Sequence, residues 1–327
     1  MPLQTVSQRD STVVAVVVTY NRRELLKQCL AALASQTQPL SAIVVVDNAS
    51  TDGTAGLLAD HPVHPEALYL SENVGGAGGF AAGMAYALTH HDPDWIWVMD
   101  DDTIPRADAL EALLSAASDS ALPLSVLSSR AVWTDGRDHP MNRPRTRMRA
   151  RTREAANASR LGGRPIRTAS YVSALLRASD VRLQGLPMAD YFIWSDDFEH
   201  TGRLLRNGFG LHVPASVVEH RTKAFGNAQE SPGNRFYFDV RNRLWVLFRS
   251  RSFRVWERVI YGSKTCLGWI QQLLKHPGLL RPGAKGLWHA IIAAPRGSDA
   301  VFAADPSVAH LINDLEVLPR PWQKSPF

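Results

Sequence analysis

The sequence predicts an α/β fold with a doubly wound sheet, and three apolar runs lead to this prediction. Residues 13–18 form a near-continuous run of valine and alanine, which is typical of a parallel strand buried on both faces. Residues 42–46 repeat the pattern after a stretch of helical character, and residues 95–99 form a third run that is rich in tryptophan. Because ligands bind at the carboxyl ends of the strands in open α/β sheets, we expect the functional site there.

The composition is that of a folded protein in a reducing compartment. Of the 327 residues, 45% are hydrophobic and 20% are charged, which allows a sizeable core in one large domain or two small ones. Cys29 and Cys266 lie far apart, so we expect no disulfide framework. Residues 1–11 lack the apolar core of a signal peptide, and no run reaches the roughly 18 apolar residues of a spanning helix. We therefore expect a cytoplasmic protein.

Two strand–helix units are expected at the start of the chain. We expect Asn21 to cap a helix over residues 22–35, and Asp52 to begin a second, short helix. Asp47, at the end of the second strand, can accept hydrogen bonds from a base or ribose, although acids at strand ends are also common in loops. Neither a Gly-x-Gly-x-x-Gly motif nor a Gly-Lys-Ser/Thr loop follows the first strand, which argues against a dinucleotide-binding domain and a P-loop.

A glycine-rich segment, residues 73–80, opens a helix that is expected to run to Leu88. Its four glycines in five residues permit close backbone approach, and a helix start offers free N–H groups to an anion. The alternative is a flexible turn with tight helix packing. Because the segment comes just before the acidic strand end, we favour a sugar diphosphate held between the glycines and a metal ion.

Three consecutive carboxylates, Asp100 to Asp102, end the third apolar run. Adjacent acids repel one another and are costly to desolvate, so such a cluster normally persists because a cation neutralises it. Side chains alternate along a strand, which places Asp100 and Asp102 on one face and turns Asp101 away. Two convergent carboxylates suit a divalent ion that also holds a diphosphate. The alternative is a solvated acidic turn that caps a helix over residues 107–117.

The middle of the chain is expected to contain further strands and a mobile loop. Residues 125–133 predict a strand, and the arginine-rich segment that follows it, as far as Arg167, is polar enough to be a mobile loop. Ordered structure resumes over residues 169–176, whose small side chains leave room for an acceptor. Residues 210–221 predict a strand, a proline turn and a second strand that ends at His220. A lone histidine is usually structural, but beside two convergent aspartates it can complete a metal site.

A second acidic site lies in the aromatic-rich segment of residues 191–200. Asp196 and Asp197 follow Phe192 and Trp194 and begin a helix. One of the two carboxylates can serve as a general base that takes a proton from an attacking hydroxyl. The neighbouring apolar wall would raise its pKa toward the working range. The alternative is a pair of acids placed at a helix start, where they are stabilised in any case.

The last part of the chain is basic and rich in tryptophan. Basic residues run from Arg241 to Lys285, and four tryptophans are interleaved with them. This pattern suits an anionic membrane surface or nucleic acid. The alternative is a set of solvated helix faces with the tryptophans in the core.

The chain as a whole resembles the inverting glycosyltransferases of family two, which have the GT-A fold. The glycine-rich segment and the triple aspartate together look most like the actinobacterial galactofuranosyltransferases of the galactan-initiating type, and rhamnosyltransferases share most of the set. The segments Asp239–Trp245 and Lys285–Trp288 are also similar to the chain-initiating member. The resemblance spans residues 13–222 and is carried by residues 17–22, 45–54, 73–80, 100–102 and 194–199 and by His220.

The resemblance implies a role for each of these residues. Asp196 would be the general base, with Asp197 as the other candidate, and Trp194 and Glu199 would contact the acceptor. A Mn²⁺ or Mg²⁺ ion that stabilises the leaving diphosphate would be bound by Asp100, Asp102 and His220. The nucleotide sugar would be bound by Thr19, Arg22, Asp47, Asn73, Gly75, Gly76, Asp100 and Asp101.

The expected protein is therefore a metal-dependent inverting glycosyltransferase. Residues 1–226 would form a GT-A domain with a Rossmann-like nucleotide-binding half and a mixed sheet, and residues 227–327 a helical extension. We expect UDP-galactofuranose as donor, a polyprenyl-diphosphate-linked cell-wall glycan as acceptor, peripheral contact with the inner face of the plasma membrane, and no nucleic acid. One alternative is a dTDP-rhamnose-dependent rhamnosyltransferase. The others are a nucleotidyltransferase, which would need a glycine-rich basic loop after the first strand, and a nucleotide- or nucleic-acid-binding protein.

Overall fold

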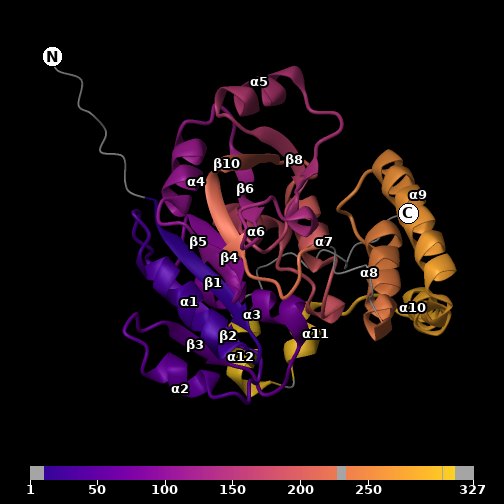
Figure 1. Cartoon of the computed structure of the whole chain (residues 1–327), viewed down its shortest axis with the longest axis horizontal. Coiled ribbons are helices and arrows are strands. Elements are labelled where there is room, and N and C mark those ends of the chain that lie inside the picture. The colour runs from indigo at the N-terminus through magenta and orange to yellow at the C-terminus, as the bar shows by residue number, and fades with distance from the viewer. Residues whose placement is uncertain (1–10, 227–232, 304, 314–327) are drawn as a thin grey trace.

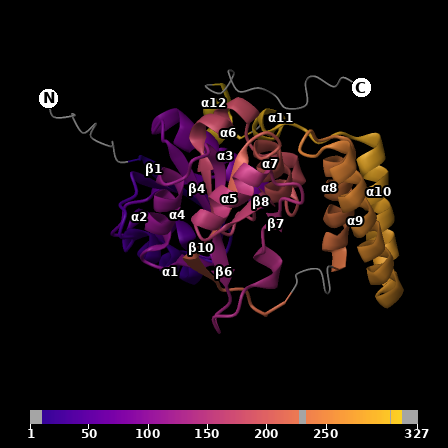
Figure 2. The ribbon, with the colours of Figure 1, turned by 90° about the horizontal axis from the view of Figure 1, so that it is seen from above.

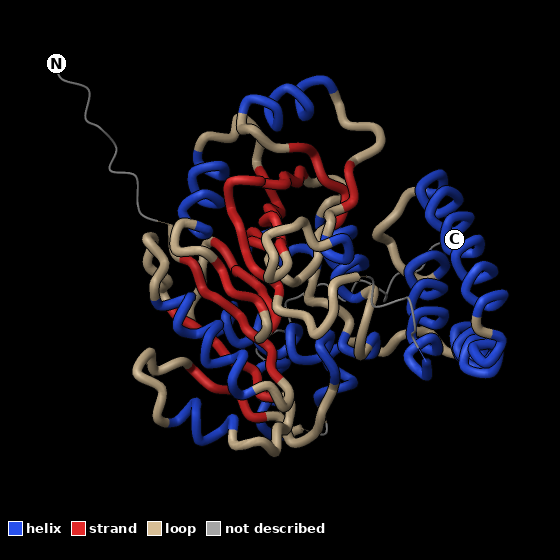
Figure 3. Tube along the Cα trace, in the orientation of Figure 1, coloured by secondary structure: helices blue, strands red, loops and turns tan. Residues whose placement is uncertain are grey.

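The computed structural model describes residues 11–226, 233–303 and 305–313, and its centre is one mixed sheet of ten strands within these residues (Figures 1 and 3). The strands are β1 (Val13–Thr19), β2 (Ala42–Asp47), β3 (Glu66–Tyr69), β4 (Trp95–Asp100), β5 (Thr103–Pro105), β6 (Leu124–Val132), β7 (Arg145–Thr146), β8 (Arg164–Thr168), β9 (Ala174–Arg177) and β10 (Phe209–His220). Their order in the sheet is β3-β2-β1-β4-β9-β6-β10-β8-β7, and β5 pairs with β10 outside this path.

The three strands predicted from apolar runs are confirmed, and they are neighbours in the sheet. β1 lies between β2 and β4 and runs parallel to both, with Val16 beside Val44 and Val98. All seven residues of β1 are buried, as the valine run predicts for a strand covered on both faces. The polar residues after these strands are therefore brought to one edge of the sheet.

The second half of the chain adds antiparallel pairs, so the sheet is mixed. β9 is antiparallel to both β4 and β6, whereas β6 and β10 are parallel. The expectation of two short strands over residues 210–221 is wrong, because β10 is a single strand of 12 residues. Its pairing with β6 shifts register between Val213 and Val217, around Pro214. A proline cannot donate to the ladder and is accommodated at such an irregularity without ending the strand.

Helices cover both faces of the sheet and give the molecule three layers (Figure 3). Alternate residues of β1 enter two different cores: Val13, Ala15 and Val17 pack with α1 and α4, whereas the residues between them pack with α3 and α6. The helices of this part are α1 (Arg23–Ala34), α2 (Thr54–Ala59), α3 (Gly75–His90), α4 (Ala109–Ser118), α5 (Thr152–Arg160), α6 (Ala178–Gln184) and α7 (Asp196–Leu204).

The start of α1 differs from the sequence prediction, whereas the helix opened by the glycine-rich segment is confirmed. Asn21 does not cap α1; it lies in the left-handed region with φ 52°, and its Oδ1 accepts a hydrogen bond from the Thr51 N–H at 2.7 Å. α3 begins at Gly75, so the glycines form the first turns of the helix itself. A Cβ on Gly79 would lie 2.5 Å from the Val18 side chain, so this glycine lets the helix pack closely on β1.

The expectation of a mobile loop before Arg167 is also wrong. This segment contains η1 (Pro140–Asn142), β7, α5 and β8. Two of its arginines have specific carboxylate partners: Arg147 lies 2.9 Å from Glu154, and Arg167 lies 2.6 Å from the buried carboxylate of Glu257. A segment of basic composition is typical of a solvated loop, but here the guanidinium groups of Arg147 and Arg167 form buried ion pairs.

The C-terminal part forms two separate groups of helices (Figures 1 and 2). α8, α9 and α10 stand side by side at one edge of the molecule, whereas α11 and α12 return to pack under α3. Asp305 anchors this return by accepting hydrogen bonds from the Ser71 N–H and hydroxyl at 2.9 and 3.0 Å. The expected domain boundary at 226/227 adjoins residues 227–232, which lie outside the described residues. The helices are α8 (Phe236–Phe248), α9 (Val255–Lys275), α10 (Leu280–Ile292), α11 (Ser298–Phe302) and α12 (Pro306–Asn313).

Within the described ranges, no helix combines the length and the apolar character that crossing a membrane requires.

Candidate active site at the carboxyl edge of the sheet

Three side chains converge where β4 and β10 end. One oxygen each from Asp100 and Asp102 and one ring nitrogen from His220 lie within 4.8 Å of one another. Asp101 points elsewhere, as strand alternation predicts, and accepts a hydrogen bond from the Thr19 hydroxyl at 2.8 Å. Two carboxylates and an imidazole are a donor set that divalent metal ions accept.

The chemistry of His220 favours a cation at this point. Its Nδ1–H donates to the Asn142 Oδ1 at 2.8 Å, which leaves Nε2 to face the Asp102 Oδ1 at 3.2 Å. That carboxylate oxygen is buried and has no hydrogen-bond partner among the described residues. A neutral ring turns its Nε2 lone pair toward this oxygen, and a cation between the two atoms would relieve that contact, whereas a protonated ring would pair with Asp102 directly. A partner that fixes the ring through its other nitrogen is the usual support of a metal-bound histidine.

The pKa values of the three aspartates also favour a bound cation. Burial and the charge of Asp102 raise the pKa of Asp100 to about 7. Burial likewise raises the pKa of Asp101 to about 6. Burial acts on Asp102 too, but His220 and Arg22 hold its pKa below the ordinary value. Burial, and after it the repulsion among the carboxylates, disfavours their charged forms, and a bound divalent ion would stabilise those forms.

Arg22 and Thr19, both predicted to hold the nucleotide, bind the acidic cluster in this structure. The Arg22 Nη1 lies 3.1 Å from the Asp101 Oδ1 and 2.5 Å from the Asp102 Oδ2. The Arg22 side chain is 46% exposed, whereas both carboxylates are buried. This arginine therefore reaches from solvent over the cluster, at the place where a negatively charged ligand would enter.

The other residues predicted to bind the nucleotide sugar lie along the same edge. Asp47 ends β2 and is buried, and Asn73 accepts a hydrogen bond from the Gly75 N–H at 2.8 Å. Gly75 has φ 74°, and a Cβ there would lie 2.0 Å from the Phe192 carbonyl oxygen. A Cβ on Gly76 would meet nothing within 4 Å. Gly75 is thus required by the backbone packing, while Gly76 borders open space.

A strained loop presents the predicted general base. Phe192, Trp194 and Ser195 all have positive φ, between 64° and 69°, and Asp196 follows as the first residue of α7. Non-glycine residues adopt this conformation only when their surroundings impose it, and such strain concentrates at functional sites. Burial and the neighbouring Asp197 raise the pKa of Asp196 well above its usual range, and Asp100 adds to the effect. A carboxylate with a raised pKa is suited to take a proton near neutral pH.

Asp197 is more firmly tied to the protein. Its Oδ1 accepts a hydrogen bond from the Phe198 N–H at 2.6 Å. Burial raises its pKa, but that hydrogen bond and the Ser170 hydroxyl oppose the shift. Burial thus raises the pKa of both adjacent carboxylates, and hydrogen bonds from Phe198 and Ser170 oppose the shift at Asp197.

Two residues of α8, both within the segment Asp239–Trp245 to which the sequence analysis gave no role in the site, hold the strained loop in place. The Asn242 Nδ2 lies 2.8–2.9 Å from the carbonyl oxygens of Tyr191, Ile193 and Trp194. Arg241 donates to the Tyr191 carbonyl at 3.2 Å. From the other side, the Ala77 N–H of α3 donates to the Phe192 carbonyl at 3.2 Å. The loop of residues 191–195 is therefore clamped between the glycine-rich helix and the C-terminal region.

The two residues predicted to contact the acceptor have different surroundings. Trp194 lies in the strained loop and is partly exposed. Glu199 is buried, forms an ion pair with Arg203 at 3.0 Å, and accepts hydrogen bonds from the hydroxyls of Ser250 and Ser252 at 2.7 and 2.9 Å. Its contact with an acceptor stays a prediction, and the contacts present here join α7 to the C-terminal region.

Asn142 and His139 are site residues that sequence reasoning missed. Both come from the segment that was expected to be a mobile loop. The ring of His139 lies 5.0 Å from that of His220, and burial together with His220 lowers its pKa to about 4. No local motif marks either residue, because their part depends on the approach of η1 to the end of β10.

Similarity searches with the sequence agree with this geometry. Residues 14–179 match the family model described as Glycosyl transferase family 2. The galactofuranosyltransferase GlfT1 of Mycolicibacterium smegmatis is 35% identical over 212 residues, which cover 63% of this chain and 70% of the relative. GlfT1 of Mycobacterium tuberculosis is 33% identical over 255 residues, which cover 72% of this chain and 82% of the relative.

Solved structures share the fold. S. aureus TarS 1-349, in complex with UDP-GlcNAc, has a TM-score of 0.56 at 13% identity, covering 94% of this chain and 88% of that chain. The mannosyltransferase PcManGT from Pyrobaculum calidifontis, in complex with GDP-Man and Mn²⁺, has a TM-score of 0.51 at 18% identity, covering 97% and 83%. At these identities the likeness concerns the fold alone, and it confirms the predicted GT-A class with a helical C-terminal region.

Proposed function

Because the chain belongs to glycosyl transferase family 2, we propose that it transfers galactofuranose from UDP-galactofuranose to a hydroxyl of a polyprenyl-diphosphate-linked glycan. The transfer would depend on a divalent metal ion and invert the anomeric configuration. The observation that carries this proposal is the meeting of Asp100, Asp102 and His220 around a buried, unpartnered carboxylate oxygen at the binding edge of the sheet.

The donor half of the site would be built on the acidic cluster. Asp100, Asp102 and His220 would hold Mn²⁺ or Mg²⁺, which supplies charge stabilisation to a leaving diphosphate. The exposed Arg22 guanidinium and the carboxyl edge of β2 would bind the nucleotide part together with Thr19 and Asp47. Asn73, Gly75 and Gly76 would line the sugar and diphosphate, and Gly76 has the open space that this requires.

The acceptor half would be built on the loop before α7. Asp196 would accept the proton of the acceptor hydroxyl as that oxygen attacks the anomeric carbon opposite the leaving group. The raised pKa of Asp196 supports this part, and the Asn242 contacts would keep the carboxylate in position. Trp194 would offer an aromatic face to the acceptor. The inversion of configuration follows from a single displacement.

The choice of donor rests on the relatives. Galactofuranosyltransferases at 33–35% identity favour UDP-galactofuranose, and dTDP-rhamnose is the second candidate. Calorimetry separates the two, with UDP and dTDP titrated in Mn²⁺ and again in EDTA. We expect UDP to bind at least about tenfold more tightly than dTDP, and only with the metal. Preference for dTDP would move the proposal to rhamnose, and metal-independent binding of both would contradict the metal site.

The surface of α9 and α10 supports a further part of the proposal, peripheral binding to an anionic membrane. Eleven of the sixteen exposed large apolar side chains in the described part of the chain lie between Phe248 and Ile292. Between residues 251 and 285, seven basic residues stand against one acid, Glu257, which is itself paired with Arg167. An apolar helix face with a cationic surround is the pattern of a helix that lies in a membrane interface.

The membrane proposal is tested by flotation with vesicles that contain phosphatidylglycerol. We expect Ile270→Asp/Leu274→Asp to lower the bound fraction at least about tenfold, since two side chains leave the apolar phase. Ile270 and Leu274 are 54% and 78% exposed on α9. Leu183→Asp is the matched control, because Leu183 is 64% exposed on α6, away from this surface. Equal loss in both variants, or no binding of the wild type at low salt, would contradict the proposal.

A further inference from the structure

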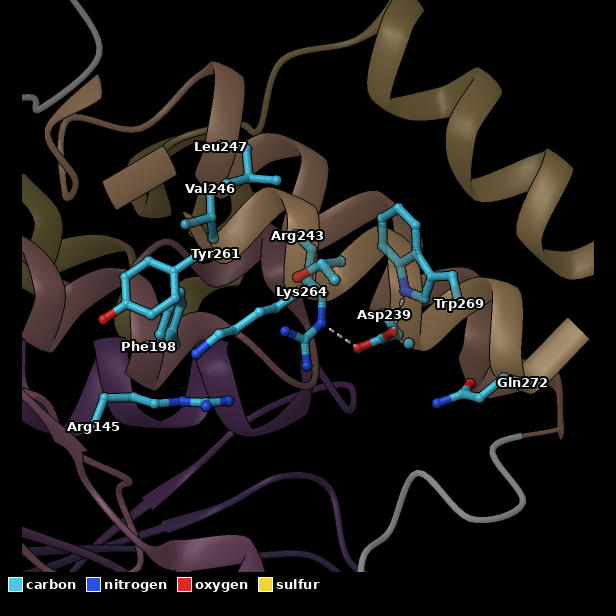
Figure 4. Close-up of a pocket in the computed structure, with 12 residues that line it drawn as sticks. Arg145, Phe198, Asp239, Arg243, Val246, Leu247, Tyr261, Lys264, Trp269 and Gln272 are labelled. Atoms are coloured by element: carbon cyan, nitrogen blue, oxygen red, sulfur yellow. Dashed lines mark hydrogen bonds and ion pairs between the residues drawn. The ribbon is translucent and has the colours of Figure 1, made fainter. Parts of the chain in front are cut away.

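A pocket with a volume of about 150 Å³ lies between the start of α7 and the helices α8 and α9, beside β7 (Figure 4). None of the site residues discussed above lines it. Three cationic and three aromatic side chains dominate its wall: Arg145, Arg243, Lys264, Phe198, Tyr261 and Trp269. The charged ends of Arg145 and Lys264 point into the same space (Figure 4).

The pocket carries an excess of positive charge. Among the described residues that line it, the carboxylate is Asp239, which lies 2.6 Å from the Arg243 Nε and accepts a hydrogen bond from the Trp269 Nε1 at 2.7 Å. Arg145 and Lys264 form no ion pair with the described residues, so three cations face one acid. Arg145 and Lys264 are exposed to solvent at the mouth of this pocket, and the positive field of the three cations would attract an anion to it.

The aromatic wall joins this pocket to the acceptor side of the active site. The Phe198 ring stacks on Phe253 at 4.7 Å and meets Tyr261 edge-on at 5.5 Å. Phe198 follows the proposed base by two residues, and a helix turns by 100° per residue. The pocket and Asp196 therefore lie on different sides of the first turn of α7. A ligand that extended from the pocket to Asp196 would place its anionic group in the pocket and its reacting hydroxyl beside Asp196.

The position of the pocket relative to α9 indicates what such a molecule would carry. Tyr261, Lys264 and Trp269 share one face of this helix, and Val259, Ile270 and Leu274 share the opposite, exposed face. A helix is about 10–12 Å across. If the exposed face lies in a membrane, the pocket stands about one helix diameter above it, at the level of lipid head groups.

We propose that this pocket binds the phosphate or diphosphate group through which the acceptor glycan is joined to its lipid chain. Arg145, Lys264 and the free end of the Arg243 guanidinium neutralise the anion, and the aromatic side chains pack against the groups attached to it. The pocket thus selects lipid-linked acceptors and sets the distance from the anion to the hydroxyl at Asp196. This inference rests on the glycosyltransferase function and the lipid-linked acceptor proposed above.

The test is a calorimetric titration of the full-length protein with farnesyl diphosphate in EDTA, which prevents chelation of the diphosphate at the acidic cluster. The variant Arg145→Gln/Lys264→Gln is compared with Lys275→Gln/Arg281→Gln, which removes the same charge from exposed positions outside the pocket. We expect the Kd to rise about tenfold in the pocket variant and to stay within about twofold in the control. Thermal unfolding of both variants verifies that they are folded.

Four results would overturn the proposal. The first is an equal Kd in the two variants, and the second is equal binding of farnesol, which lacks the anion. The third is inorganic pyrophosphate binding as tightly as farnesyl diphosphate, which would make this a free-anion site. The fourth is displacement of the ligand by phosphatidylglycerol vesicles, which would assign the pocket to a phospholipid head group. UDP binding in Mn²⁺ is measured in parallel. Its absence in the wild type would refute the proposed function without changing the farnesyl diphosphate result.

Discussion

The variant Asp196→Asn is expected to lower kcat about a thousandfold, because a positioned general base contributes a rate factor of about this size. Asparagine has nearly the same shape but cannot accept the proton of the acceptor hydroxyl. The donor site is built from other side chains, so the Kd for UDP in Mn²⁺ is expected to stay within about twofold. Steady-state kinetics with the lipid-linked acceptor and calorimetry with UDP measure the two quantities.

Asp197→Asn is the matched comparison, since it removes a charge from the adjacent position. Burial and the charge of Asp197 raise the pKa of Asp196, so removal of that charge lowers it. Transfer requires the ionised base, and the acid limb of the pH–kcat profile should therefore move to lower pH in Asp197→Asn, with a smaller loss of rate. If Asp197→Asn is the inactive variant and Asp196→Asn is active, Asp197 is the base.

Loss of a metal ligand is expected to have an effect of similar size. Asp102→Asn and His220→Ala should each weaken Mn²⁺ binding about a hundredfold or more and lower kcat/KM about a thousandfold. Asn142→Ala should weaken Mn²⁺ binding about tenfold, because it removes only the partner of the His220 Nδ1. Calorimetric titration with Mn²⁺ measures the metal affinity of each variant independently of its enzymatic activity.

Asp101→Asn is the control for the acidic cluster. Asp101 is as buried as Asp102 and also contacts Arg22, but it bonds to Thr19 and lies outside the convergent group. Its variant should retain Mn²⁺ binding within about threefold. Equal loss of Mn²⁺ binding in Asp101→Asn and Asp102→Asn would show that the cluster acts through its total charge and not through a defined set of ligands.

The elements with a strong local pattern could be predicted from sequence. The valine run of β1 and the strand that ends at Asp100 follow from local patterns, and the predicted convergence of Asp100 and Asp102 is confirmed although Asp101 and Asp102 lie in the turn after that strand. The prediction of a mobile loop before Arg167 failed because arginine in a solvated loop and arginine in a buried ion pair have the same local sequence character. What distinguishes them is a partner such as Glu257, 90 residues away.

Contacts between residues far apart in the sequence also limited the prediction of the candidate active site. His220 could be suggested as a ligand, but its orienting partner Asn142 lies 78 residues earlier and could not. The hydrogen bonds that hold the loop before Asp196 likewise join residues about 50 positions apart, from Asn242 to Tyr191. Hydrogen bonds of this kind depend on the docking of whole elements, so no short sequence pattern encodes them.

The sequence by itself determined the strands and helices of the first half of the sheet, the edge at which the site lies and the carboxylates that face it, because hydrophobic periodicity and side-chain alternation act over a few neighbouring residues. The tertiary structure alone decided which nitrogen of His220 faces Asp102, how the loop before Asp196 is held in a strained conformation, and that three cations of β7, α8 and α9 share one pocket. These features arise only when elements distant in the chain pack together, and that packing fixes the direction of each buried polar group.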